Sequence, residues 1–359
     1  MNQWVRMLLK NRLYQLLCIL FLFFLVCCES GTSEKSINLY RITGESQGTT
    51  YTIQIYDKDL NFNKVEIDSI LEEFDQELST YQYSSLISRF NQMDFKDTIL
   101  YNSSKFVTML QLSDSVYQLS DGLFDPSIKP LMDLWGFDEE KGTVPSRSAI
   151  DSVLRYVDFK KGTHFDYSKS SDSSIQVMKY SPSFQLDFNG IAQGYAVDVL
   201  MDFLKSRGHK NIYAELGGEI ALSGFKVNNE NWRIGVETPI ENNKTSEKIV
   251  QKTFTLSNKC IATSGNYRKY FEVNGEKYAH TLNPNTGFQN HHNLLSATVF
   301  SKSCAVSDAF ATYFMLVGVA GTQDFLLTHP DLGLDVFLIY DELNEYKTYL
   351  SKGLISAAE

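Results

Sequence analysis

The dipeptide Asn274-Gly275 is the sequence feature that most restricts how this chain folds. It separates two short segments, residues 270–273 and 276–279, and Asn-Gly accepts the positive φ angles of a type I′ turn between antiparallel strands. Further strands are predicted near residues 51–56, 186–188, 212–215, 220–222, 294–300 and 335–340. Helical spacing of apolar residues predicts helices over about residues 64–78, 104–119, 192–205 and 306–317, with a loop or exposed hairpin at 160–174.

Helices and strands are thus interleaved, with prominent hairpin signals. No Gly-x-Gly-x-x-Gly motif follows a predicted strand, which disfavours a doubly wound nucleotide-binding fold. No proline- or glycine-rich linker divides the chain. We therefore predict an α+β fold, a single compact unit with a largely antiparallel sheet and flanking helices.

The N-terminal segment has the composition of a secretion signal. Basic Arg6, Lys10 and Arg12 precede an apolar stretch over residues 13–26, which is shorter than the usual membrane span. The stretch ends in Leu25-Val26-Cys27-Cys28 and turns polar at once, which resembles a bacterial lipobox. We predict a signal peptide over 1–27, a lipid-modified Cys28 with a polar tether to residue 38, and the main domain over 39–350. The alternative is an uncleaved anchor, and both interpretations place the body outside the cytoplasm.

Charge and cysteine content limit the partners. The 359-residue chain carries a formal net charge of −10. This charge argues against a nucleic-acid-binding protein, because such a protein needs basic residues to neutralise the phosphates. Beyond the N-terminal segment, the cysteines are Cys260 and Cys304. A disulfide between them is conceivable in an oxidising compartment, but two separate buried thiols are favoured because a domain of this size does not require one.

Four clusters place polar residues or glycine where a simple core would not. The first, residues 121–126, contains Asp125 and is also typical of an ordinary turn. The second, residues 187–195, forms a strand–turn–helix junction, where a helix N-terminus favours an anionic phosphate. The third combines residues 263–267 with His280 and the turn at 283–287. A histidine beside a turn is often structural, so that alternative stays open.

The fourth cluster, residues 307–312, places an acid at the start of an otherwise apolar helix. Asp308 could simply cap this helix. Alternatively, Asp308 and Thr312 share one helical face, so that both oxygens could reach one hard cation. The sequence has no zinc spacing, Walker loop or Gly-x-Ser-x-Gly motif. A Mg²⁺ site for a phosphate-containing substrate is the chemistry that remains.

In this order, the clusters resemble the ApbE-type flavin transferases, the FAD:protein FMN transferases. The matching segments cover most of residues 40–340 and are residues 47–51, 78–81, 88–91, 122–127, 131–137, 186–198, 217–220, 263–267, 278–280, 284–287 and 308–312. The resemblance implies an α+β fold that binds FAD in a cleft, with Mg²⁺ at the pyrophosphate. It also implies transfer of FMN to a threonine of a membrane redox-complex subunit, with release of AMP.

Individual roles follow from the resemblance, residue by residue. The FAD contacts that it implies are Gln47, Tyr81, Leu123, Phe124, Asp125, Asp187, Gln193 and Leu282. The implied metal ligands are the Gly190 carbonyl, Asp308, and the backbone or hydroxyl at Ala311 and Thr312. His280 is the implied base for the incoming hydroxyl, and Asp308 acts with it as a catalytic residue.

This chain departs from the family pattern at four positions. Gln47 replaces a usual Met, Gln193 replaces a frequent Lys, and Glu219 and Asn283 replace frequent Asp residues. The change at Gln193 removes a positive charge near the phosphates. Two other functions therefore stay open, a Mg²⁺-dependent FAD pyrophosphatase and a non-catalytic flavin-binding lipoprotein.

Overall fold

The computed structural model describes Trp4, Met7 and residues 36–94, 98–137, 143–239, 249–266, 270–273 and 275–359. The chain divides into two units, Met1–Ile37 and Asn38–Glu359. The predicted signal peptide and Cys28 fall almost entirely outside the described residues. The second unit includes residues 351–359, beyond the predicted domain end, and Leu354 there is fully buried.

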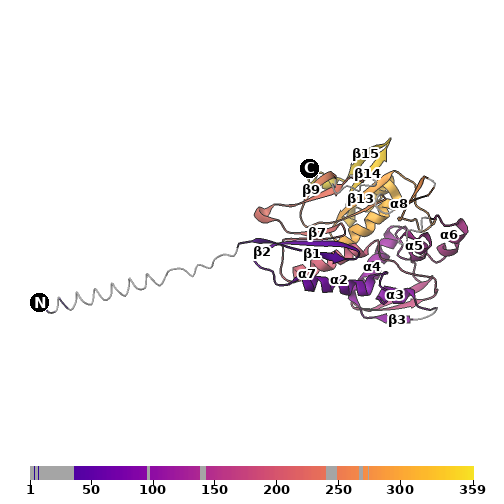
Figure 1. The fold of residues 1–359 in the computed structure, drawn as a ribbon, viewed down its shortest axis with the longest axis horizontal. Coiled ribbons are helices and arrows are strands. Elements are labelled where there is room, and N and C mark those ends of the chain that lie inside the picture. Colours follow the sequence, from indigo (N-terminus) through magenta and orange to yellow (C-terminus); the bar gives the residue numbers. More distant parts are fainter. Residues whose placement is uncertain are drawn as a thin grey trace. The chain divides into compact units, whose positions relative to one another are not determined.

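An eight-stranded antiparallel sheet forms the centre of the second unit (Figure 1). Its strands, in spatial order, are β1 (Asn38–Ser46), β2 (Thr49–Asp57), β6 (Ile212–Leu216), β7 (Glu219–Ser223), β10 (Cys260–Gly265), β13 (Leu294–Ser301), β14 (Asp335–Glu342) and β15 (Glu345–Leu350). Every neighbouring pair in it is antiparallel. The predicted α+β class with a largely antiparallel sheet is therefore confirmed.

Three smaller sheets accompany it within the part of the chain that the structure describes. They are β3-β5-β4 (Thr98–Tyr101, Ser174–Lys179, Phe165–Ser171), β8-β9 (Trp232–Glu237, Val250–Leu256) and β11-β12 (Tyr270–Val273, Glu276–Ala279). The last is the hairpin predicted from Asn-Gly, with Tyr270 opposite Ala279. The polar segment at 160–174 contributes β4 and the start of β5, so the hairpin alternative holds there.

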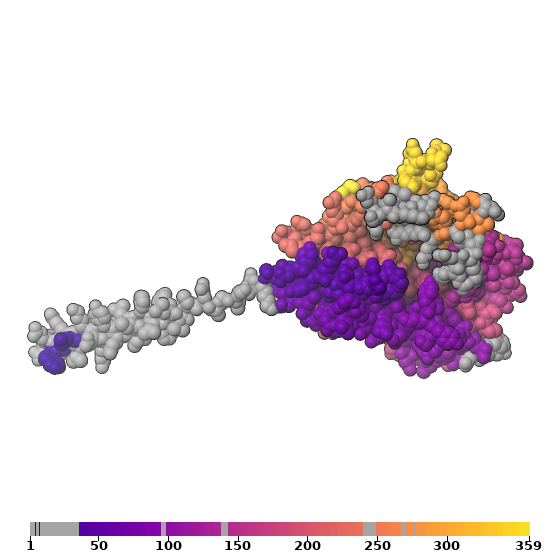
Figure 2. Space-filling view, viewed as in Figure 1, coloured from indigo at the N-terminus to yellow at the C-terminus, as the bar shows by residue number. Residues whose placement is uncertain are grey.

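Most of the helices begin at a side-chain cap, and each buries apolar residues; α5 and α7 begin without such a cap. They are α2 (Lys64–Leu78), α3 (Leu86–Asn91), α4 (Ser104–Leu119), α5 (Lys129–Trp135), α6 (Arg147–Leu154), α7 (Ala192–Ser206) and α8 (Cys304–Thr328). Asn63 caps α2 in a capping box with Glu66, and Ser103 caps α4, which satisfies amides that the first turn leaves without partners. Figure 1 shows α2, α7 and α4 together beneath β1 and β2, and the N-terminal part of this unit makes one continuous indigo-to-purple face in Figure 2.

The main sheet is covered on both faces. Alternate strand residues point to opposite sides, so Val299 packs in the core formed with the helices, whereas Phe300 packs in a second core. Trp232 of β8 and Phe254 of β9 belong to that second core. The sheet thus separates a helical layer from the β8-β9 ribbon, which explains why β13 is buried along nearly its whole length.

Three local expectations were wrong or incomplete. The segment ending at Phe188 is not a strand, because Leu186 pairs through its N–H and C=O with the side chain of Asn91 instead of a neighbouring strand. Strands β1, β3, β8, β9, β10 and β15 were not predicted, nor was β5 beyond its first residue. Helix α8 also continues to Thr328, past a break at Gly318 (φ 70°).

One helix within the described residues, α8, is long and apolar enough to cross a membrane. About two thirds of its most apolar window (67%) is buried in the protein. Since it packs against α7, β10 and β13, we interpret α8 as a core helix.

Candidate active site at the junction of α7 and α8

Asp308 links the two central helices. It lies in the second turn of α8, whose N-cap is Ser303, so the interpretation of Asp308 as the helix cap is wrong. Its side chain is 7% exposed, and Oδ2 accepts a hydrogen bond from the Gly194 amide at 3.0 Å. Burial raises the pKa of Asp308 to about 7, the Gly194 hydrogen bond opposes this rise, and nearby Asp198 adds to it.

Gly194 permits the close approach of α7 to α8. A Cβ at this position would lie 2.3 Å from the Cys304 carbonyl oxygen and 2.8 Å from the Asp308 Cβ. Backbone atoms cannot yield as a flexible side chain can, so residue 194 must be glycine for this packing. The Gln193-Gly194 motif therefore sets the position of the Asp308 carboxylate.

Thr312 lies one turn beyond Asp308 and meets two other segments. Its Oγ1 lies 3.3 Å from the Ser264 Oγ on β10. A Cβ built on Gly190 would lie 3.5 Å from Thr312 Oγ1 and 3.3 Å from the Phe124 ring. Gly190, Thr312 and Phe124, singled out from separate parts of the sequence, are thus neighbours.

The residues present fit a hard divalent cation. A carboxylate, a hydroxyl and backbone carbonyls are the oxygen donors that Mg²⁺ prefers. Burial disfavours the charged form of the Asp308 carboxylate and raises its pKa. A bound cation would stabilise that charged form and so offset the cost of its desolvation. Ala311 is fully buried within α8, so we take the Thr312 hydroxyl as the more accessible donor of these two residues.

The segment around Phe124 is a tightly bonded turn. Asp125 Oδ1 accepts from the amide and hydroxyl of Ser127 at 2.7 and 2.6 Å, and Oδ2 accepts from the Phe159 amide at 3.3 Å. Burial raises the pKa of Asp125 to about 6, against these hydrogen bonds. The two oxygens organise the loop, and Phe124 is buried beside Gly190 while Leu123 is half-buried.

Gln47 and Gln193 flank one end of the main sheet. Gln47 occupies the β1–β2 turn with φ 53°, and its Nε2 donates to Asp75 Oδ1 at 3.1 Å. Gln193 Nε2 lies 3.0 Å from where a Cβ would stand on Gly217. Since the Gly217 amide donates to the Thr50 carbonyl, the turns at 47–48 and 217–218 and the start of α7 lie close together.

The other predicted residues lie on other segments of the chain. Asp187 turns the chain before α7 by accepting from the Asn189 amide at 2.7 Å, and its own amide donates to the Pro126 carbonyl at 2.7 Å. Tyr81 is 67% exposed, and half-buried His280 follows β12. Leu282 is buried in a small satellite core with Trp135, which gives this side chain a packing role.

The comparison with protein families decides the relationship. The ApbE family model matches residues 47–337. The chain belongs to the ApbE family. This confirms the resemblance inferred from the ordered motifs, and with it an enzyme of the flavin transferase kind.

Curated relatives and solved structures agree with this assignment. The chain is 33% identical over 291 residues to "FAD:protein FMN transferase" of Vibrio cholerae, an alignment that covers 79% of this chain and 83% of the relative. Its fold is similar to flavinyl transferase ApbE of Pseudomonas stutzeri in its apo form, with TM-score 0.76 and 31% identity over 89% of this chain and 98% of that chain. Flavin transferase ApbE from Vibrio cholerae gives TM-score 0.75 and 28% identity over 89% and 99% of the two chains.

Two contributors in this ApbE-family chain, Asp198 and Ser264, lie within the segments 186–198 and 263–267 but were given no individual role from the sequence. Asp198 of α7 accepts hydrogen bonds from the Ser303 hydroxyl and from the Cys304 and Ala305 amides at 2.7, 2.8 and 3.0 Å. It thereby fixes the first turn of α8, ahead of Asp308. Ser264 contacts Thr312, as described above. An acid among the apolar residues of a predicted helix was the available signal for Asp198.

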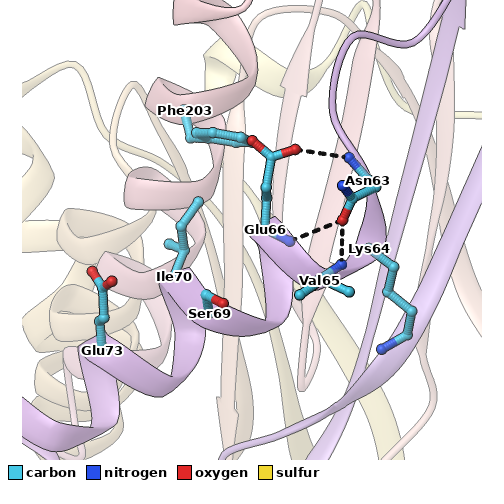
Figure 3. Close-up of a pocket in the computed structure, with 8 residues that line it drawn as sticks. All are labelled: Asn63, Lys64, Val65, Glu66, Ser69, Ile70, Glu73 and Phe203. Atoms are coloured by element: carbon cyan, nitrogen blue, oxygen red, sulfur yellow. Dashed lines mark hydrogen bonds between the residues drawn. The ribbon is translucent and has the colours of Figure 1, made fainter.

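Two surface hollows lie along α2. One, of about 720 Å³, is lined by Asn63, Phe203 and the first turns of α2 (Figure 3). None of the predicted site residues lines it. The other, of about 560 Å³, is lined by Asp75 and Gln82 among others. This second hollow adjoins Gln47, because its lining residue Asp75 accepts a hydrogen bond from Gln47 Nε2.

Proposed function

We propose that this protein is a Mg²⁺-dependent FAD:protein FMN transferase that attaches FMN to a threonine of another protein and releases AMP. The observations that carry the proposal are the contact of Asp308 with the Gly194 amide and the position of Thr312 beside Gly190, in a chain of the ApbE family. Relatives of 33% and 30% identity bear the name FAD:protein FMN transferase.

The proposed reaction is a single displacement at phosphorus. The acceptor threonine oxygen forms a bond to the FMN phosphorus of FAD, and the bond from that phosphorus to the bridging oxygen of the pyrophosphate breaks. AMP leaves with the bridging oxygen, and the proton of the hydroxyl passes to a base, for which we propose His280. Positioning and charge stabilisation supply most of the acceleration in such transfers.

Asp308, Thr312 and the Gly190 carbonyl would hold Mg²⁺, with Ala311 adjoining them. The cation would supply positive charge against the pyrophosphate. The chain's own part is to place these oxygens, which it does through Gly194, Asp198 and Ser264. Phe124 beside Gly190 and the bonded turn at Asp125 would form a wall of the FAD site.

The proposed location is the extracytoplasmic, periplasmic face of a bacterial membrane, with a lipid on Cys28. The sequence pattern at residues 6–31 supports this location. An acceptor subunit of a membrane redox complex facing the same compartment would meet a tethered enzyme by diffusion in the membrane plane. Gln193, which lacks the charge of a lysine, is the residue that favours the alternative of a non-catalytic flavin carrier.

The decisive experiment mixes the full chain in detergent with FAD, Mg²⁺ and a candidate redox subunit. We expect a fluorescent acceptor band on a denaturing gel, lost with EDTA and lost when the acceptor threonine is replaced by valine. Release of AMP and free FMN without a labelled protein, across several acceptors, would instead identify a pyrophosphatase. Bound, unaltered FAD would identify a carrier.

A further inference from the structure

Two buried thiols meet where β10 and α8 begin. Cys260 is the first residue of β10 and Cys304 the first of α8, with exposures of 7% and 0%. Both are free thiols. Their sulfurs and an Asp198 carboxylate oxygen all lie within 4.8 Å of one another. They are therefore two buried thiols without a bond between them, as favoured from the sequence, and they are also neighbours.

The surroundings of the pair favour a cross-link over a metal site. The Asp198 oxygens already accept three hydrogen bonds from the first turn of α8, so a cation there would compete with the cap of that helix. The Cys304 thiol donates to the Ile220 carbonyl at 3.1 Å. A structural zinc site requires four ligands, whereas the group found among the described residues contains three.

We propose that Cys260 and Cys304 form a modification site, an intrachain disulfide made by exchange with a disulfide oxidant. The two Sγ atoms form one S–S bond and give up their two hydrogens, while the S–S bond of the oxidant breaks and yields two thiols. No other group on the chain is oxidised or reduced in this exchange.

The disulfide would attach the start of α8, the helix that carries the proposed metal ligands, covalently to β10. It closes the loop of residues 260–304, which includes β11, β12 and His280, and it ties β10 to α8 four residues before Asp308. Closing a loop of this length restricts the unfolded chain and so stabilises the folded one. The predicted export of this chain would expose the pair to an oxidising compartment.

Burial also determines when the bond can form. It raises the pKa of the Cys304 thiol, so the reactive thiolate is scarce in the folded protein. Thiol–disulfide exchange with a dissolved oxidant is therefore slow once the protein has folded. It is fast during folding, while the two thiols are still exposed to solvent. The same burial protects the finished disulfide from external thiols.

The test refolds the full chain in detergent, either in a buffer of oxidised and reduced glutathione or in excess reductant. Non-reducing peptide mapping should detect a peptide pair linked through Cys260 and Cys304 after oxidative refolding. The thermal midpoint of that form should exceed that of the reduced form by about 5 °C or more. Mapping separates this bond from any bond that involves the N-terminal cysteines.

Variants make the assignment specific. Cys260→Ser and Cys304→Ala should each abolish the linked peptide and the difference in midpoint between the two buffers. The matched control Ser113→Ala, at a buried small polar residue of α4, should retain both. Alkylation of both thiols after oxidative refolding would overturn the proposal. A linked form that melts at or below the reduced one would overturn it too. So would protection of both thiols by Zn²⁺ alone, reversed by EDTA, because it would identify a metal site.

Discussion

The Asp308 carboxylate accepts a hydrogen bond from the backbone amide of Gly194 over 3.0 Å, and this contact joins the first turn of α7 to the second turn of α8. The two residues are 114 positions apart. The amide lies at the positive end of the α7 dipole, which favours a negative charge, whereas burial opposes that charge. The contact thus fixes the position of the Asp308 carboxylate, for which we propose the role of a metal ligand.

Replacing Asp308 by Asn tests its proposed role as a metal ligand. The amide keeps an oxygen for the Gly194 N–H but removes the negative charge that Mg²⁺ requires. We expect Asp308→Asn to fold and to lose Mg²⁺-dependent turnover of FAD by about 100-fold or more. The matched control is Asp324→Asn, an exposed acid on the same helix, which should keep full activity. Equal activity of both variants at ordinary Mg²⁺ concentrations would refute the role.

Gly194→Ala should separate α7 from α8. Its methyl group would lie 2.3 Å from a backbone oxygen, so the helices must move and the unfolding free energy should fall by about 3 kcal/mol. FMN transfer should fall with it, because Asp308 shifts. Gly190→Ala is the contrast, since its methyl group would stand at 3.3 Å or more from its neighbours and should cost about 1 kcal/mol or less. Urea unfolding gives the unfolding free energy of each variant. Equal values for Gly194→Ala and Gly190→Ala would contradict the requirement for glycine at residue 194.

The raised pKa of Asp125 predicts a pH dependence of stability. The folded protein keeps this proton up to about pH 6, whereas an unfolded aspartate loses it near pH 4. The folded state therefore binds more protons between these values, so the unfolding free energy should fall as pH rises from about 4 to about 6, by up to about 3 kcal/mol. The Asp125→Asn variant should lack this component. Urea unfolding of both proteins between about pH 4 and pH 6 measures this difference. If the unfolding free energy of the two proteins changed with pH in the same way, the prediction of a raised Asp125 pKa would be wrong.

The elements with clear local signals were predictable from the sequence. Helices α2 and α4 begin after Asn63 and Ser103, and both predicted ranges match the structure. By contrast, β5 alternates Ile175, Val177 and Lys179 toward the core. A lysine at a buried position hides the apolar pattern of such a strand. Its Nζ donates to the Phe90 and Asn91 carbonyls at 3.2 and 2.9 Å, contacts that a local pattern cannot show.

The sequence predicts a set of site residues but not how they are arranged in space. Asp308 could be a cap or a ligand until the structure placed Ser303 at the cap position. The continuation of α8 beyond Gly318 also depends on distant groups, since His292 contacts the Met315 carbonyl at 2.7 Å and Asn290 donates to that of Leu316 at 2.6 Å. These side chains satisfy the carbonyls that the break would leave free.

Variants at Cys27 and Cys28 test which of the two cysteines carries the predicted lipid. We expect Cys28→Ser to abolish lipid attachment and processing, because the cysteine itself becomes the modified residue, whereas Cys27→Ser should be processed normally. Intact-mass analysis of membrane-extracted protein distinguishes the outcomes. A mature chain that retains Met1, or that starts well beyond residue 28, would contradict the prediction.

Gln193 offers a test of how the site tolerates the loss of a family lysine. It lies in the first turn of α7 with Nε2 near the Gly217 turn, where a donor could reach an anionic phosphate. A charged hydrogen bond contributes about 1.5–3 kcal/mol and a neutral one about 1 kcal/mol. Gln193→Lys should therefore tighten FAD binding several-fold, with a steeper dependence on salt.

Gln193→Met is the matched control, because it keeps a similar length and removes both donor and charge. It should weaken FAD binding by several-fold, and its affinity should change little with salt. Fluorescence titration of the three proteins with FAD, with and without Mg²⁺, orders them as Lys, Gln and Met from tightest to weakest. Weaker binding by the lysine variant would instead mean that Gln193 belongs to a rearranged site, in which its contact region at Gly217 and Thr49 leaves no room for the longer side chain.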